Sequence, residues 1–187
     1  MRSLTPFIWT PKQPIHGFDR GGMPPRQELP NRWFFFRREL ELSAIPDQAT
    51  VNITTDGHYE FFVNGKRVGR GPVRCNPLYQ RYDTYDLRPY LTAGRNMLAV
   101  LVHTYGADAA FYELPKGLHL RTFGDGGLWL EGEASFQSSK LALRSDTDWR
   151  VMESDAWLQD VPKTNNSLGF IEVLDARKLP ENWHSLD

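Results

Sequence analysis

Apolar and polar residues alternate with a period of two in several short stretches, and no other feature constrains the fold of this chain as strongly. In ATVNITT, residues 49–55, one face carries alanine, valine and isoleucine while the other is polar. The stretches 59–64 and 128–136 repeat the pattern, and residues 96–105 are apolar on both faces. Successive side chains of a β-strand point to opposite faces, so these stretches predict antiparallel strands, with residues 96–105 as a central one.

The dipeptide Asn64-Gly65 interrupts the aromatic run YEFFVNGKRVG, residues 59–69. Both residues tolerate the positive φ angles of a type I′ turn, so the dipeptide predicts a β-hairpin. We expect three side chains before the turn to lie in the core and two cations after it to lie in solvent. These are Tyr59, Phe61 and Val63 in the core, and Lys66 and Arg67 in solvent.

Strand signals outnumber helix signals throughout the chain. About eight or nine short strands can be marked, with turn residues between them. Helical signal is confined to residues 86–91, where Asp86 can cap a single turn, and Asp83 and Tyr85 are expected to serve the same turn. Aromatic residues make up 13% of the chain, with 15 glycines and 13 prolines. This combination predicts an all-β fold, a β-sandwich.

The domain organisation follows from the distribution of proline and glycine. Residues 1–31 contain six prolines, a density that no regular element survives. They are expected to form an extended lead-in that packs on the sandwich, because they also carry phenylalanine and tryptophan. The sandwich itself is expected over residues 32–178, and residues 179–187 are expected to begin a linker or a next domain.

Charge and cysteine content exclude several classes of partner. The net charge is −1, which gives no general attraction to nucleic acids or to anionic membranes. Cys75 is the only cysteine, so no intramolecular disulfide can form. The first residues lack the apolar segment of a secretory signal, and no run is long enough to span a membrane. A cytoplasmic location is therefore expected for the chain as it stands, and an extracytoplasmic one if a leader has been removed.

Motifs for catalysis and for cofactor binding are missing from the sequence. The five histidines lack the spacing of metal ligands, and no nucleophile elbow, Walker loop or dinucleotide fingerprint occurs. His103 lies in an apolar stretch and is expected to be a core or supporting histidine. We therefore predict no catalytic residue, no metal site and no cofactor.

Two carboxylate pairs, Glu131/Glu133 and Asp146/Asp148, are spaced two residues apart. Glycoside hydrolysis needs two acids across a sugar cleft, whereas neighbours on one strand face usually point to solvent. Together with Asp125, the second pair can supply oxygen ligands to calcium, although its spacing does not demand a calcium site.

Several segments together resemble the N-terminal domain of bacterial α-L-rhamnosidases. They are ATVNITTDGHYEFFVNGKRVGRGP, YQRYDTYDLRPYLTAGRNMLAVLVH, DTDWRVME, GFIEVLDARKLPENW and, near the start, FIWTP. The resemblance implies a jelly-roll sandwich, similar to galactose-binding domains, that accompanies a large α/α-barrel catalytic domain. In such enzymes two acids on the barrel hydrolyse terminal L-rhamnose. That domain is absent here, so the resemblance implies a non-catalytic piece of a longer enzyme, inactive alone.

The long irregular segment of residues 106–127 is the sequence's candidate for sugar contact, because long loops are often functional. Sugar binding needs an aromatic face and hydrogen-bonding groups. The candidate contacts are Phe111, Tyr112, Asp108 and Glu113, and Trp129 on the adjoining strand. Alternatively, the aromatic side chains fold back and close one end of the sandwich.

A polar cluster lies near the end of the chain, at Glu172, Asp175 and Arg177. We expect an internal salt bridge here, and the alternative is a contact to the missing catalytic domain. Two functions remain open at this level. The module either recognises a carbohydrate such as a rhamnose-containing glycan, or serves as a purely structural domain that buttresses the enzyme or its oligomer.

Overall fold

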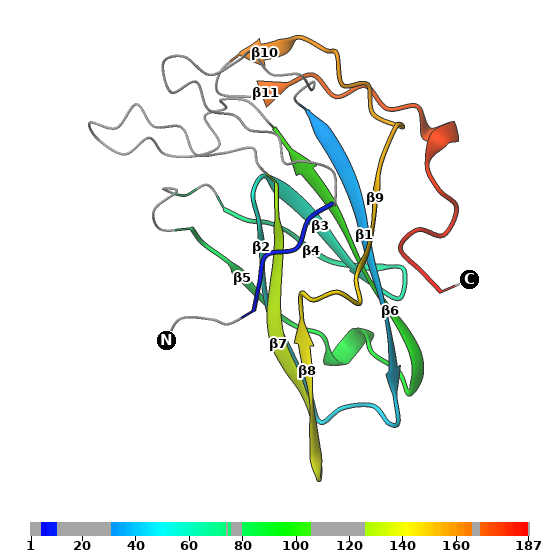
Figure 1. The fold of residues 1–187 in the computed structure, drawn as a ribbon. Helices are drawn as coiled ribbons and strands as arrows, with labels where there is room; N and C mark the ends of the chain where they lie inside the picture. The colour runs from blue at the N-terminus through cyan, green and yellow to red at the C-terminus, as the bar shows by residue number, and fades with distance from the viewer. Residues whose placement is uncertain are drawn as a thin grey trace.

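Two antiparallel β-sheets pack face to face in a computed structural model, which describes residues 5–10, 31–73, 75, 80–105, 126–165 and 169–186 (Figure 1). One sheet has the strand order β4-β3-β6-β1-β9 and the other the order β5-β2-β7-β8. The five strands of the first are β1 (Arg32–Leu42), β3 (His58–Val63), β4 (Lys66–Gly71), β6 (Gly94–Thr104) and β9 (Arg150–Glu153). The four of the second are β2 (Gln48–Thr55), β5 (Asp83–Asp86), β7 (Leu128–Phe136) and β8 (Ser139–Arg144).

The remaining elements are short. Strands β10 (Lys163–Asn165) and β11 (Gly169–Phe170) pair with each other, and 3₁₀ turns span Arg88–Tyr90 and Ala176–Lys178 among the described residues. Within the described residues there is no α-helix, and no helix is long and apolar enough to cross a membrane. The predicted all-β jelly-roll sandwich is confirmed.

The period-2 pattern fills the space between the sheets. Side chains on alternate positions of β1, β2, β3, β6 and β7 are almost fully buried, as burial of one face of each sheet requires. The core includes Phe34, Phe36, Ala49, Val51, Ile53, Tyr59, Phe61, Val63, Leu98, Val100, Leu128 and Leu130.

The predicted hairpin is present between β3 and β4. Asn64 and Gly65 have φ angles of 50° and 78°, as a type I′ turn requires. The Asn64 side chain also ties the turn to β6, because its Oδ1 accepts a hydrogen bond from the Met97 amide at 2.8 Å. The two cations that follow, Lys66 and Arg67, are exposed as predicted.

One prediction near β5 is wrong. Asp83 and Tyr85 lie in a strand that pairs with β2 rather than in a turn. The alternation in DTYD is too short to stand out in the sequence, and pairing with the edge of β2 determines its conformation. Asp86 does act as expected, since its Oδ1 accepts a hydrogen bond from the Arg88 amide at 3.0 Å.

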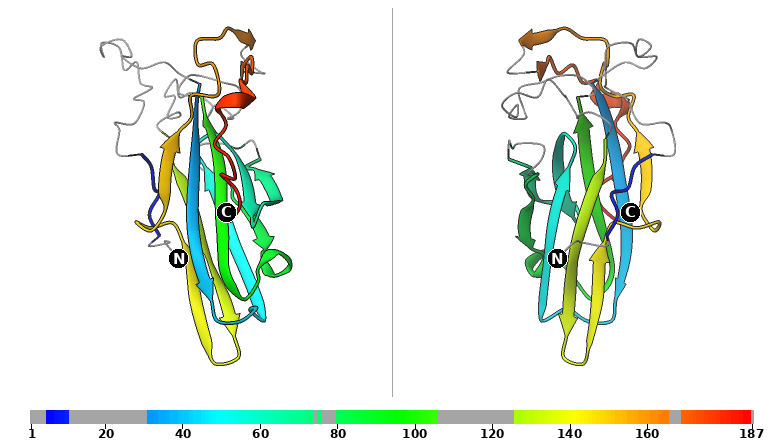
Figure 2. Two further views of the ribbon diagram at one scale, coloured as in Figure 1. Left: turned by 90° about the vertical axis from the view of Figure 1, so that its right-hand side faces the viewer. Right: turned by 60° about the vertical axis from the view of Figure 1, so that its left-hand side comes forward.

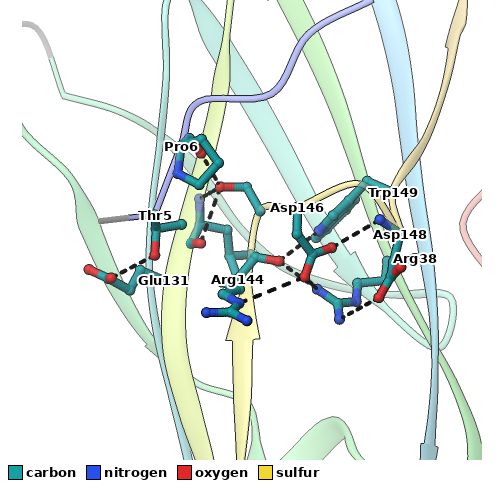
Figure 3. Close-up of polar contacts among 10 residues, drawn as sticks. Thr5, Pro6, Arg38, Glu131, Arg144, Asp146, Asp148 and Trp149 are labelled. Carbon is teal, nitrogen blue, oxygen red and sulfur yellow. Dashed lines mark hydrogen bonds and ion pairs between the residues drawn. The ribbon is translucent and has the colours of Figure 1, made fainter. Parts of the chain in front are cut away.

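Residues 5–10 lie along the four-stranded sheet. Ile8 forms an isolated bridge with Leu128, and the Trp9 ring packs 4.4 Å from the Phe34 ring in the core. Figure 3 shows two further ties, since Thr5 Oγ1 donates to Glu131 at 2.6 Å and Ser145 Oγ donates to the Pro6 carbonyl at 2.6 Å.

An arginine forms ion pairs with both members of the second carboxylate pair. The Arg38 guanidinium donates to Asp146 at 2.9 Å and to Asp148 at 3.3 Å (Figure 3). Arg38 comes from β1 while the two aspartates follow β8, so this contact joins the two sheets. The Asp146/Asp148 pair therefore has a structural partner.

The outer face of the five-stranded sheet is covered by the C-terminal part of the chain, which runs across β1 and β6 in Figure 2. A second apolar cluster forms there from Phe35, Leu101, Ala156 and Trp157. Trp183 extends the cover, with its ring 4.8 Å from Phe35. Residues 179–186 thus lie on the sandwich, and the predicted domain boundaries at 31/32 and 178/179 stay predictions.

Candidate functional site

Most of the sugar contacts expected from the sequence cannot be placed. Asp108, Phe111, Tyr112 and Glu113 lie outside the described residues. Trp129 lies on the outer face of β7 in the four-stranded sheet, partly exposed, with its ring 6.0 Å from that of Tyr82. Its proposed contact with sugar stays a prediction.

The C-terminal polar cluster divides into two separate interactions. Arg177 forms a bidentate ion pair with Asp175, with both nitrogen–oxygen distances at 2.8 Å. This hydrogen bonding lowers the pKa of the Asp175 carboxyl, but the pair is exposed. Glu172 takes no part, because its Oε1 accepts a hydrogen bond from the Trp157 indole N–H at 2.9 Å. The expected salt bridge thus involves two of the three residues.

A cleft of about 600 Å³ opens on the outer face of the five-stranded sheet, a volume typical of ligand sites. Its floor comes from the outward-facing residues of β3 and β6. They are His58, Glu60, Leu101 and His103.

Two walls enclose this floor. On the β1 side the wall is built by the C-terminal segment, with Trp157, Leu158, Phe170, Ile171, Glu172 and Val173. On the β4 side it is built by Gly71, Pro72 and Val73, together with Asp83 from β5 of the other sheet.

Stacked aromatic rings hold the β1-side wall against the sheet. Trp33 on β1 lies directly opposite His103 on β6, and their rings stack at 4.0 Å with a 2° interplanar angle. Trp157 stacks on the other side of Trp33, at 4.4 Å and 10°. Stacked rings lose little conformational freedom on binding, so this array gives the wall a fixed shape.

Asn31 joins the floor of the cleft to the same wall. Its Nδ2 donates to the carbonyls of Leu158 at 3.3 Å and Gln159 at 3.4 Å. The amide is thereby oriented, so Oδ1 faces His103 and accepts a hydrogen bond from its Nε2–H at 2.7 Å. Asn31 has a φ of 66°, a conformation that asparagine tolerates better than most residues.

The β4-side wall contains a second hydrogen-bonded group. The Tyr59 hydroxyl donates to Asp83 Oδ2 at 2.6 Å. The hydroxyl oxygens of Tyr59 and Tyr85 lie 3.2 Å apart. Burial and the hydrogen bond to Asp83 raise the pKa of Tyr59 well above its usual value. Gly71 leaves the space for this contact, because a Cβ there would overlap with the Asp83 carboxylate.

Burial keeps both histidines of the floor uncharged at neutral pH. It lowers the pKa of His103 to about 3, with a smaller contribution from His58. Burial and then the positive charge of Arg70 lower the pKa of His58. His103 is therefore a supporting histidine as expected, but on the outer face of the sheet rather than in the central core.

Acidification should destabilise the domain through His103. The unfolded chain protonates this histidine near pH 6.5 and the folded chain only near pH 3, so stability falls as pH drops through that window. Between pH 7 and pH 5 the loss should be about 2 kcal/mol. Urea unfolding of the wild type and of His103→Gln at both pH values tests this. Equal pH dependence in the two proteins would contradict it.

The two sides of the cleft stand far apart, because three strand spacings of the sheet, about 14 Å, separate β4 from β1. Within the residues that the structure describes, no three histidine, cysteine or acidic side chains are grouped as metal ligands.

Sequence reasoning missed this cleft because topology assembles it. Its residues come from positions between Asn31 and Val173, and only the pairing of β1, β3 and β6 brings them together. One feature of the sequence could have pointed to the cleft. Trp33 and His103 are large polar-edged rings at outward positions of two strands whose other residues are mostly apolar and buried.

Comparison with known proteins gives a consistent pattern. The family model described as the alpha-L-rhamnosidase N-terminal domain matches residues 44–187. The alpha-L-rhamnosidase of Formosa agariphila is 25% identical over 160 residues, covering 81% of this chain and 16% of that protein. The GH78 family rhamnosidase of Bacillus sp. GL1 superimposes with a TM-score of 0.77 at 33% identity, covering 99% of this chain and 17% of that one.

A lectin has a similar fold. The Pleurotus ostreatus lectin superimposes with a TM-score of 0.51 at 20% identity, covering 88% of this chain and 37% of the lectin. Of the rhamnosidases described above, by contrast, the chain spans only about one sixth of the length.

Proposed function

Because this chain belongs to the α-L-rhamnosidase N-terminal domain family, we propose that it is a non-catalytic accessory module of an α-L-rhamnosidase-type glycoside hydrolase and recognises carbohydrate. Its partners are then a rhamnose-containing glycan and the catalytic domain of the same enzyme. The relatives are about six times longer, which leaves ample length for a separate catalytic domain.

The observation that carries the sugar-binding proposal is the cleft on the five-stranded sheet. It combines aromatic and aliphatic surface with carboxylates held in place by neighbouring side chains. Sugars present apolar C–H faces and a ring of hydroxyl groups, so both kinds of surface are needed. The likeness to a lectin is one of fold and is compatible with this role.

A second candidate function has its own observation. Four apolar side chains of the β1-side wall and its continuation, Leu158, Ile171, Val173 and Leu174, are between 42% and 56% exposed. Adjacent exposed apolar side chains often mark an interface. In this alternative the module is a structural domain that buttresses the enzyme or its oligomer.

Calorimetric titration of the chain with L-rhamnose and rhamnosylated oligosaccharides separates the two candidates. We expect binding at millimolar ligand or below, unchanged by calcium or by EDTA, and no turnover of an aryl rhamnoside. Absence of heat above dilution at millimolar ligand, with circular dichroism showing folded protein, would favour the structural role. Turnover of the aryl rhamnoside would contradict both.

A further inference from the structure

We propose that the cleft binds an oligosaccharide of at least two sugar units, gripped at its two ends by Asp83 and Glu172, rather than a single terminal sugar. This inference rests on the proposed function and specifies its ligand. Its basis is the position of the two carboxylates in one cleft and the way each is held.

The two carboxylates stand on opposite sides of the floor. Asp83 comes from β5 of the other sheet and lies beside Gly71 at the end of β4, while Glu172 is bonded to Trp157, whose ring stacks on Trp33 of β1. Strands β3 and β6 lie between them in the sheet. Three strand spacings amount to about 14 Å, so a ligand that reaches from the β4 side of the cleft to the β1 side must be longer than one sugar ring.

Each carboxylate is fixed through one oxygen by an uncharged donor. Asp83 Oδ2 accepts from the Tyr59 hydroxyl at 2.6 Å, and Glu172 Oε1 accepts from the Trp157 indole at 2.9 Å. Neither carboxylate has an ion-pair partner within the described part of the chain, and the second oxygen of each accepts no hydrogen bond there. A fixed carboxylate with a free oxygen is a strong acceptor for a sugar hydroxyl.

The surface between the two anchors suits the rest of such a ligand. Leu101 and the stacked rings of Trp33 and His103 provide apolar surface. A volume of about 600 Å³ falls within the 300–1,000 Å³ range that encloses drug-sized molecules, which are larger than a monosaccharide.

The other charged groups near the cleft do not form such anchors. Glu60 on the floor is paired with Arg67 at 3.7 Å, and Arg70 is exposed at the edge. Lys163 stands over the Phe170 ring at 5.2 Å.

Isothermal titration of the full chain with L-rhamnose and with its α-linked disaccharide and trisaccharide tests the proposal. We expect the best oligosaccharide to bind about tenfold more tightly than L-rhamnose, because it makes one more charge-assisted contact. Asp83→Asn and Glu172→Gln should each remove that gain, since either anchor alone holds one end. Only one of the two variants should weaken L-rhamnose binding.

Both substitutions keep an oxygen that can accept the hydrogen bond from Tyr59 or Trp157, so the fold should be retained. Glu133→Gln, which removes an exposed carboxylate from the four-stranded sheet, is the matched control and should leave every affinity unchanged. Equal affinity for L-rhamnose and both oligosaccharides would overturn the proposal, as would an unaltered oligosaccharide affinity in both folded variants. If none of the three sugars binds, the proposed function itself is contradicted.

Discussion

Replacing Gly57 with alanine should destabilise the domain by about 2–5 kcal/mol, a large part of the 5–15 kcal/mol typical of a domain. Gly57 connects β2 to β3 with a φ of 125°, where an L-residue costs about 1–2 kcal/mol. A Cβ there would also overlap with the backbone carbonyl of His103 on β6, and such overpacking adds about 1–3 kcal/mol. The urea midpoint of the purified variant measures the sum.

Gly94→Ala is the matched control for this substitution. Gly94 also has a positive φ, of 86°, but the nearest atom to a Cβ there is Glu41 Oε1 at 3.9 Å. Its cost should therefore be limited to the conformational term, about 1–2 kcal/mol. Equal losses in the two variants would show that β6 moves aside at no cost and that the close approach at Gly57 is unimportant.

Replacing Trp157 with alanine should cost about 3–5 kcal/mol of stability and abolish oligosaccharide binding. The ring is only 6% exposed and packs in the second apolar cluster with Phe35 and Leu101. It also stacks on Trp33 and holds Glu172. Its removal therefore leaves a cavity and releases the β1-side wall. Thermal unfolding and sugar titration of the same preparation measure both effects.

Two further substitutions separate packing from binding. Trp157→Phe keeps an aromatic ring but removes the indole N–H, so it should retain most stability while weakening the hold on Glu172. Trp129→Ala removes a partly exposed ring on the other sheet and should cost about 1 kcal/mol without affecting binding in the cleft. If sugar affinity follows Trp129 instead of Trp157, the binding site lies on the four-stranded sheet and the cleft is not the site.

The fold was largely readable from local pattern. The alternation in residues 49–55 and 128–136 predicted strands whose inward and outward faces are confirmed, and Asn64-Gly65 predicted the turn found there. The resemblance to α-L-rhamnosidase N-terminal domains is also confirmed by the family match. Period and turn chemistry are local properties, so one sequence is enough to reveal them.

The candidate site was not readable in this way. Asn31, His58 and Glu172 have no shared motif, and only cross-strand pairing and the return of the C-terminal segment bring them together. Asp83 was assigned to a turn because four residues carry too little periodicity to identify a strand. Glu172 was grouped with Asp175 and Arg177 because they are close in sequence, whereas its partner is Trp157.

The connectivity of β1 also affects how the domain folds. This strand pairs with β6 on one side and with β9 on the other, and both partners lie far along the chain. Its outer face is covered later still, by Trp157 and Trp183. Contacts between distant parts of a chain make folding slow, typically milliseconds to seconds. During synthesis one edge of β1 can pair only after β6 has been made, and its other edge and its apolar outer face stay open until the chain has reached β9 and Trp157.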